Sequence, residues 1–200
     1  MKKEMKYNLA FTAGALLYNE SLYFIQAIDY TEDYLKNEFS VHSDVLVTNA
    51  ESSRKRIKSE LDKRLKNLDV DYLNKFSLFT EQDQKVILFL AICKTYSIIT
   101  EFALEVVFNK WKNFDNELST YDFKYFLSSK LSEEQLNSIS EHSLYKLSQV
   151  AVKMFKDVGV FKEDKLSTVH ISDELVELLK TKGDAWFLPC ILNPNVEDTE

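Results

Sequence analysis

The stretch from Glu81 to Trp111 has the sequence EQDQKVILFLAICKTYSIITEFALEVVFNKW, thirty-one residues that contain neither glycine nor proline. Thr80 precedes it and Asp83 follows three residues later, a spacing typical of a helix N-terminus. The polar and β-branched run from Lys94 to Ser97 predicts a break, so we expect two helices rather than one. Both are too apolar to stand alone, and the pair is therefore expected to form the centre of a helical bundle.

The whole chain favours helices as well. Its 200 residues include only 3 glycines and 2 prolines, while 45% are apolar and 28% are charged. This composition is that of a folded globular protein and excludes collagen-like, proline-rich and loop-dominated β architectures. The densest apolar run is only eight residues long, against roughly 18 for a membrane span. We expect a cytoplasmic protein without a membrane partner.

A shift in composition near residues 113–116 predicts two modules. Residues 1–115 are expected to form an N-terminal helical bundle domain with a basic helix, and residues 116–200 a winged helix-turn-helix-like domain with an acidic tail. In the second module Ser119, Ser132 and Ser140 are candidate caps of helices at 120–130, 133–139 and 141–158. Gly159 ends the third helix, and the pattern then predicts a short β-hairpin between Val160 and Ile171. Ser172 caps a last helix over 173–182, and residues 193–200 are expected to be disordered. The predicted fold class is mainly α.

Positive charge is concentrated in one segment of an acidic chain. The net charge is −7 overall, −1 in residues 1–115 and −6 in residues 116–200. Between Ser52 and Lys66, however, SSRKRIKSELDKRLK carries seven basic and two acidic residues, including every arginine of the protein. Thr48 and Glu51 have the spacing of a capping box in front of this segment.

The basic segment is predicted to be an amphipathic helix over roughly 49–67 that binds the phosphates of duplex DNA. Ile57, Leu61, Leu65 and Leu68 fall on one buried stripe. The remaining arc presents the predicted DNA-binding residues of this helix: Lys55, Arg56, Lys58, Lys63 and Lys66. The alternative is a solvated helix face neutralised by Glu60–Arg64 and Asp62–Lys66 pairs. Arg54 and Arg64 lie close to the apolar stripe and are expected to be structural, at its edge or paired with a buried acid.

The helix predicted at 141–158 offers a second set of candidate DNA-binding residues, Lys146, Gln149 and Lys153. The acidic balance of this half and its lack of arginine argue against sequence-specific recognition, and a scaffold for protein contacts is the alternative. The predicted hairpin tip places Glu163 and Asp164 between Lys162 and Lys165. A neutral tip of this kind is expected to contribute less to DNA affinity than the basic helix.

No motif of the sequence supports catalysis. The histidines, His42, His142 and His170, are not at metal-ligand spacings, and Cys93 and Cys190 have no CxxC partner. We expect no enzyme, no cofactor, no metal and no small-molecule substrate. The aromatic residues Tyr121, Phe123, Tyr125 and Phe126 crowd one predicted helix; a helix wedged between the two modules explains them better than base stacking does.

Short motifs along the chain are similar to those of the BrxA family of BREX phage-resistance systems. The segment LAFTAGALL at residues 9–17 resembles its T-A-G-x-L start, and SSRKRI at 52–57 with Arg64-Leu65 resembles its S-x-x-T-x-K-R-I stretch and R-L pair. Lys146-Leu147, Gln149-Val150, Gly159 and Ile171-Ser172 resemble its closing L-x-Q-V…G…I-S pattern.

This resemblance implies a small, non-catalytic, all-helical protein that binds double-stranded DNA and acts beside other BREX proteins. Two alternatives remain open: a protein-interaction adaptor within the defence complex, and an RNA-binding helical protein like the antitermination factor NusB. The acidic second half departs from the expectation of DNA contacts by the wing, which favours the basic helix as the main contact.

Overall fold

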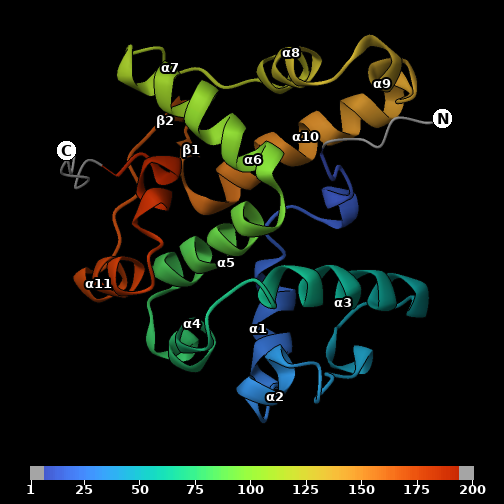
Figure 1. Cartoon of the computed structure of the whole chain (residues 1–200), viewed down its shortest axis with the longest axis vertical. Coiled ribbons are helices and arrows are strands. Elements are labelled where there is room, and N and C mark those ends of the chain that lie inside the picture. The colour runs from blue at the N-terminus through green and yellow to red at the C-terminus, as the bar shows by residue number, and fades with distance from the viewer. Residues whose placement is uncertain (1–6, 194–200) are drawn as a thin grey trace.

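The computed structural model describes residues 7–193 and is mainly helical (Figure 1). Its α-helices are α1 (Tyr18–Gln26), α2 (Thr31–Leu35), α3 (Glu51–Leu65), α4 (Val70–Lys75), α5 (Glu81–Thr95), α6 (Ser97–Phe102), α7 (Phe108–Lys112), α8 (Thr120–Lys130), α9 (Glu133–Asn137), α10 (Glu141–Val158) and α11 (Asp173–Thr181). The shorter turns are η1 (Phe11–Ala13), η2 (Ser43–Val45), η3 (Phe76–Leu78), the π-helical turn η4 (Ala103–Val107) and η5 (Ala185–Ile191); the strands are β1 (Phe161–Lys162) and β2 (Lys165–Leu166).

The apolar stretch at 81–111 forms the centre of the molecule, as predicted. Thr80 caps α5 by accepting a hydrogen bond from the backbone N–H of Asp83, and the whole run from Val86 to Cys93 is buried. The chain breaks at Tyr96, so that the helical segment beginning at Ser97 is bent by 111° from α5. The predicted break between two helices is therefore confirmed.

Within the described part of the chain, no single helix is long and apolar enough to cross a membrane. The bent pair Glu81–Thr95 and Ser97–Lys112 reaches the length and composition of a span only when its two arms are taken together.

Aromatic contacts join residues from both sides of the segment at 113–116. Phe102 meets Phe123 with ring centroids 5.0 Å apart, and Phe89 of α5 meets Phe155 of α10 at 5.2 Å. Buried side chains from before and after this segment belong to one hydrophobic cluster. The division into domains at 115 stays a prediction, and the proposed boundary lies in the irregular link between α7 and α8.

The elements of the second half follow the predicted order. Ser132, Ser140 and Ser172 cap α9, α10 and α11 through their side chains, and Ser119 forms a capping box with Asp122. Gly159 ends α10 in the left-handed region with φ of 91°, which glycine adopts without a Cβ clash. The hairpin is present but short, since Phe161 pairs with Leu166 and Lys162 with Lys165.

The ends of several expected segments differ in this half. The helices expected over 133–139 and 173–182 end at Asn137 and Thr181. The second strand stops at Leu166 rather than Ile171, because the N–H of Val169 bonds to the carbonyl of Ile191 in η5 and not to another strand. Asn193, the first residue of the predicted disordered tail, is buried; residues 194–200 lie outside the described part of the chain.

One predicted helix start is wrong. The capping box of Thr48 and Glu51 does not form: Ala50 is the N-cap of α3, the Thr48 hydroxyl is buried without a hydrogen-bond partner, and Glu51 pairs with Lys55.

The aromatic helix α8 is only half explained by burial. Phe123 and Phe126 lie in the core, but Tyr121 and Tyr125 are 78% and 82% exposed. The interpretation that the whole cluster is wedged between two modules is therefore wrong for the tyrosines.

Candidate nucleic-acid interface

Four of the seven cations in the basic stretch are paired with carboxylates. Lys55 pairs with Glu51, Lys58 with Asp62, Arg64 with Glu60 and Arg54 with Asp44, at N–O distances of 2.6, 2.5, 2.7 and 3.7 Å. The expected Glu60–Arg64 pair is thus confirmed. The expected Asp62–Lys66 pair is wrong, since Asp62 instead contacts Lys58 and the hydroxyl of Tyr34.

The other three cations, Arg56, Lys63 and Lys66, have no carboxylate partner among the described residues. At about 100° and 1.5 Å per residue they fall within an arc of about 80° and along about 15 Å of helix, opposite the buried leucine stripe. The positive charge of α3 is therefore concentrated in one row, which we call the α3 cation row.

Two members of the α3 cation row are held on tyrosine rings. The Nζ of Lys63 lies 4.5 Å from the ring centroid of Tyr96, and the Nζ of Lys66 lies 5.1 Å from that of Tyr34. Burial raises the pKa of both tyrosines far above its ordinary value, and the acidic partners Glu60 and Asp62 raise it further. At neutral pH both rings are uncharged and hold the ammonium groups by cation–π attraction.

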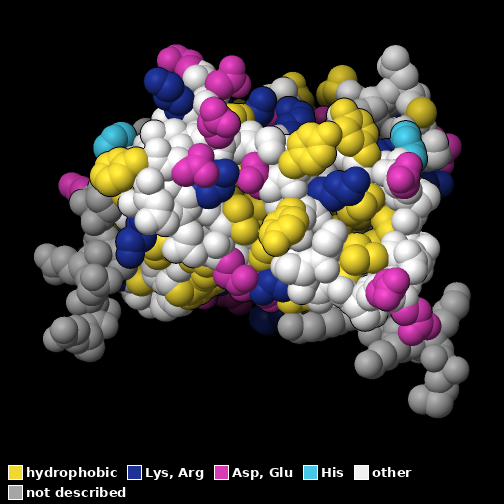
Figure 2. Space-filling model, turned by 90° about the horizontal axis from the view of Figure 1, so that it is seen from above, with side chains coloured by type: hydrophobic (Ala, Val, Ile, Leu, Met, Phe, Trp, Pro, Cys, Tyr) yellow, Lys and Arg dark blue, Asp and Glu magenta, His cyan; other side chains and the backbone are white. Residues whose placement is uncertain are grey.

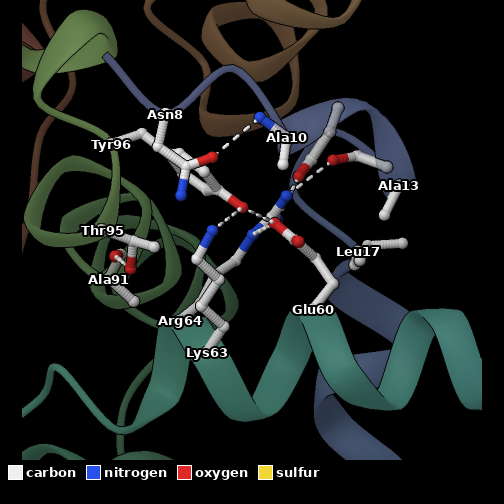
Figure 3. A network of polar contacts seen from close by, with 12 residues as sticks. Asn8, Ala10, Ala13, Leu17, Glu60, Lys63, Arg64, Ala91, Thr95 and Tyr96 are labelled. Carbon is white, nitrogen blue, oxygen red and sulfur yellow. Dashed lines mark hydrogen bonds and ion pairs between the residues drawn. The ribbon is translucent and has the colours of Figure 1, made fainter. Parts of the chain in front are cut away.

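A buried network of hydrogen bonds holds the segment at 14–15 against α3 (Figure 3). Arg64 donates to Glu60 and to the backbone carbonyls of Gly14 and Ala15, and the hydroxyl of Tyr96 also donates to Glu60. Arg64 is thus paired with a buried acid, as the sequence predicts, and its charge is not available to a ligand.

The candidate residues of α10 are exposed, but they are not equivalent. Lys153 pairs with Asp157 at 2.8 Å, one turn further on. Lys146 makes no ion pair in the described structure, and it lines a hollow of about 350 Å³ together with Thr12. Gln149 is exposed on the same helix. On α10, Lys146 is therefore the predicted cation whose charge is uncompensated.

The turn η1 lies between α3 and α10 (Figure 1). Arg56 donates to the carbonyl of Ala13 at 3.4 Å from one side, and Lys146 on the other side lines the same hollow as Thr12. The structure therefore brings candidate residues of both halves to the same short turn, although ninety residues of chain separate them.

A second hollow of about 600 Å³ lies between the chain at 14–20 and α10. Lys85, Lys153 and Lys156 line it, together with Glu20 and Asp157. Sequence reasoning missed Lys85, because it directly precedes the densest apolar run of the chain, Val86–Cys93, and belongs to no local cluster of positive charge.

The described residues offer no group of three or more histidine, cysteine or acidic side chains that could hold a metal ion. His42 and Asp44 lie 3.0 Å apart, but both are largely exposed.

Comparison with known proteins identifies the family. The BrxA family model matches residues 5–183 of this chain. The chain belongs to the BrxA family. The family resemblance seen in the sequence motifs is therefore confirmed, and the protein is a component of a BREX defence system.

One relative and one solved structure are similar over most of their length. The BREX protein BrxA of Bacillus cereus (strain H3081.97) is 25% identical over 166 residues, which cover 80% of this chain and 83% of the relative. The crystal structure of an uncharacterized protein from Magnetospirillum magneticum matches with a TM-score of 0.71 at 19% identity, covering 94% of this chain and 98% of that one. The second similarity shows that the fold is shared.

Proposed function

We propose that this BrxA family member binds double-stranded DNA through its phosphates, without catalysis. The observation that carries the proposal is the α3 cation row: Arg56, Lys63 and Lys66 share one face and lack carboxylate partners, whereas the other cations of the basic stretch are paired. Unpaired cations gain most from a phosphate, because binding releases counterions and breaks no existing ion pair.

The tyrosine rings support this proposal. A flexible lysine side chain loses rotamer entropy when it binds a ligand. Lys63 and Lys66 lose less of it, because Tyr96 and Tyr34 already hold their ammonium groups in place. Side chains that contact only phosphates do not distinguish one base from another, so the binding is expected to tolerate different DNA sequences. Because phosphate binding releases counterions, the affinity is expected to fall steeply as the salt concentration rises.

In this proposal Lys146 and Gln149 extend the contact onto α10, and Lys55, Lys58 and Lys153 contribute less because each already has a carboxylate partner. The order α8, α9, α10 and then the β1–β2 hairpin supports a winged-helix interpretation of the second module. Its wing tip is neutral, and the α3 cation row is therefore the main phosphate contact.

The experiment is a salt titration of duplex DNA binding with the variant Arg56→Gln, Lys63→Gln, Lys66→Gln. Glutamine removes charge without placing a carboxylate beside Glu60 or Asp62. The plot of log affinity against log salt concentration has a negative slope, and losing three phosphate contacts is expected to make that slope shallower by up to about 2.7. The matched control replaces Lys36, Lys112 and Lys180, exposed lysines outside α3, by glutamine, which changes net charge equally.

Equal loss of binding in both triple variants would show that net charge, not the α3 cation row, determines affinity. Unchanged binding in the α3 variant would contradict the proposed interface. The same titration with single-stranded DNA and with structured RNA tests the NusB-like alternative, which a clear preference for RNA would support.

A further inference from the structure

The hollow beside η1 is lined by groups that suit a phosphate. Its volume is about 350 Å³, and the described residues that line it come from the chain at 9–12 and from the first two turns of α10. None of them is acidic. Four have side chains that donate hydrogen bonds and two are leucines: Thr12, His142, Ser143, Lys146, Leu9 and Leu147. The hollow of about 600 Å³ differs, because Glu20 and Asp157 line it.

The donors of this hollow are not engaged elsewhere in the described structure. His142 and Lys146 lie one helical turn apart on α10 and are exposed, and neither side chain forms an ion pair or a hydrogen bond with another described residue. The hydroxyl of Ser143 accepts from that of Ser140 at 2.8 Å, so its own proton remains for a ligand. A phosphate in the hollow would therefore gain donors without breaking an ion pair.

The charged groups around His142 favour an anion as well. The segment at 8–13 carries no titratable side chain, and Lys146 is the cation that shares the hollow. Glu141, the preceding residue, lines a different hollow, where Lys124 accompanies it. The acidic residues of α9, the helix before α10, do not line the hollow of His142 either. No carboxylate of the described residues therefore neutralises this hollow from within.

The hollow continues the proposed phosphate contact of α3. Thr12 lines it, and on the other side of η1 Arg56 donates to the carbonyl of Ala13, the next residue. Arg56 is the first member of the α3 cation row, so unpaired cations lie on both sides of one short turn. The face of the molecule above α8 is different, because acidic side chains lie among the basic ones there (Figure 2).

We propose that this hollow holds a backbone phosphate of the duplex and that His142 makes the contact pH-dependent. The inference rests on the proposed function, because the ligand is the same DNA. Histidine is the side chain that ordinarily changes its charge between pH 5 and 8. A protonated ring adds a positive charge and a second N–H donor beside Lys146, and a phosphate next to it stabilises that form. Duplex affinity therefore rises as the pH falls, and binding takes up a proton.

The test measures duplex binding by the full chain at about pH 6 and pH 8, by fluorescence anisotropy at equal ionic strength. Wild-type affinity is expected to be about three- to fivefold higher at the lower pH, the range of one exposed ion pair. His142→Gln is expected to bind equally at both pH values, with the affinity that the wild type has at the higher pH. His142→Lys keeps a positive charge and is expected to bind tightly at both.

The matched control is His170→Gln, which removes an exposed histidine between β2 and α11 and is expected to keep the pH dependence of the wild type. NMR titration of the histidine ring signals gives a second readout. Duplex DNA is expected to raise the pH at which the His142 signals titrate and to leave those of His170 unchanged. Inorganic phosphate at equal ionic strength is expected to have a smaller effect on His142 than the duplex has.

Two results would overturn the inference alone. The first is equal pH dependence in the wild type and His142→Gln, while the α3 triple variant still loses binding. The second is a larger NMR effect of inorganic phosphate than of duplex, which would assign the hollow to a free anion. A wild type that binds no duplex at either pH would contradict the proposed function and this inference together.

Discussion

Arg64 and Gly14 are fifty residues apart in the chain, and the Nη2 of Arg64 donates to the Gly14 carbonyl at 2.8 Å. The same guanidinium binds the carbonyl of Ala15 and the carboxylate of Glu60. One buried side chain thus joins the T-A-G segment to the R-L pair of α3. This contact gives a physical reason why the two motifs occur together in the chain.

Replacing Arg64 by methionine is expected to lower the free energy of unfolding by about 3–5 kcal/mol, because Glu60 is left buried without its counter-charge. Urea denaturation measures the change. Lys55→Met is the control: its pair with Glu51 is exposed, and its loss is expected to change the free energy of unfolding much less than the loss of Arg64 does. Equal effects of the two substitutions would contradict the role assigned to Arg64.

Gly14→Ala is expected to destabilise the protein through a single contact. A Cβ at this position would lie 2.4 Å from Cδ2 of Leu17, while the backbone is extended and imposes no strain of its own. We expect a loss of about 1–2 kcal/mol, most of which disappears in a Leu17→Ala background. A double-mutant cycle by thermal or urea unfolding checks the coupling, and additive effects would exclude it.

The hairpin tip is a place where the sequence can be improved. Glu163 and Asp164 both have positive φ, 51° and 58°, as in a type I′ turn that favours Asn-Gly. Glu163→Asn with Asp164→Gly is expected to stabilise the fold by about 0.5–1 kcal/mol. A rise in the unfolding midpoint tests this expectation, and an unchanged or lower midpoint would contradict it.

The β1–β2 hairpin, the wing of the predicted winged helix, is expected to contribute less to DNA affinity than α3 does. Replacing Lys162 and Lys165 by alanine should reduce affinity by less than the α3 triple variant does, because Glu163 and Asp164 already neutralise the tip. Mobility shifts at one low salt concentration compare the two variants. A larger effect of the wing lysines would make the hairpin the main DNA contact.

Three buried tyrosines predict a loss of stability in alkali. Tyr34, Tyr72 and Tyr96 donate to Asp62, Asp184 and Glu60, and burial together with these carboxylates raises each pKa above its ordinary value near 10. The stabilising contribution is complete below about pH 10 and declines as pH rises, because the unfolded chain then releases protons that the folded chain retains. Urea midpoints between pH 8 and 11 measure this decline, and Tyr72→Phe should make it less steep.

Sequence predicted those parts of the fold that depend on local chemistry. The serine caps, the αL glycine at Gly159 and the break near Tyr96 all involve groups within a few residues of one another. The failed Thr48 cap shows the limit: Arg54 binds the Thr48 carbonyl and the chain approaches α3 in an extended path, a tertiary effect that no spacing encodes.

The sequence was enough to locate the basic segment of the candidate site. It was not enough to tell which of its cations are unpaired or which other segments lie beside them. Composition located the basic helix, and angular arithmetic placed Arg64 near the apolar stripe. Lys58 and Lys66 each lie one helical turn from Asp62 and compete for its carboxylate. Asp62 pairs with Lys58, and Lys66 is therefore left without a carboxylate partner in the described structure. The approach of Arg56 and Lys146 to one turn depends on long-range packing and leaves no trace in either segment.

The chain at 14–16 is held by groups that are made at very different times. Arg64 follows Gly14 by fifty residues, but Asp157, which accepts from the Leu16 N–H, follows by 141. At about 5–20 residues per second on the ribosome, that second partner appears roughly 7–30 s after Leu16 itself. The contacts of the chain at 14–16 therefore cannot be complete until α10 has been synthesised.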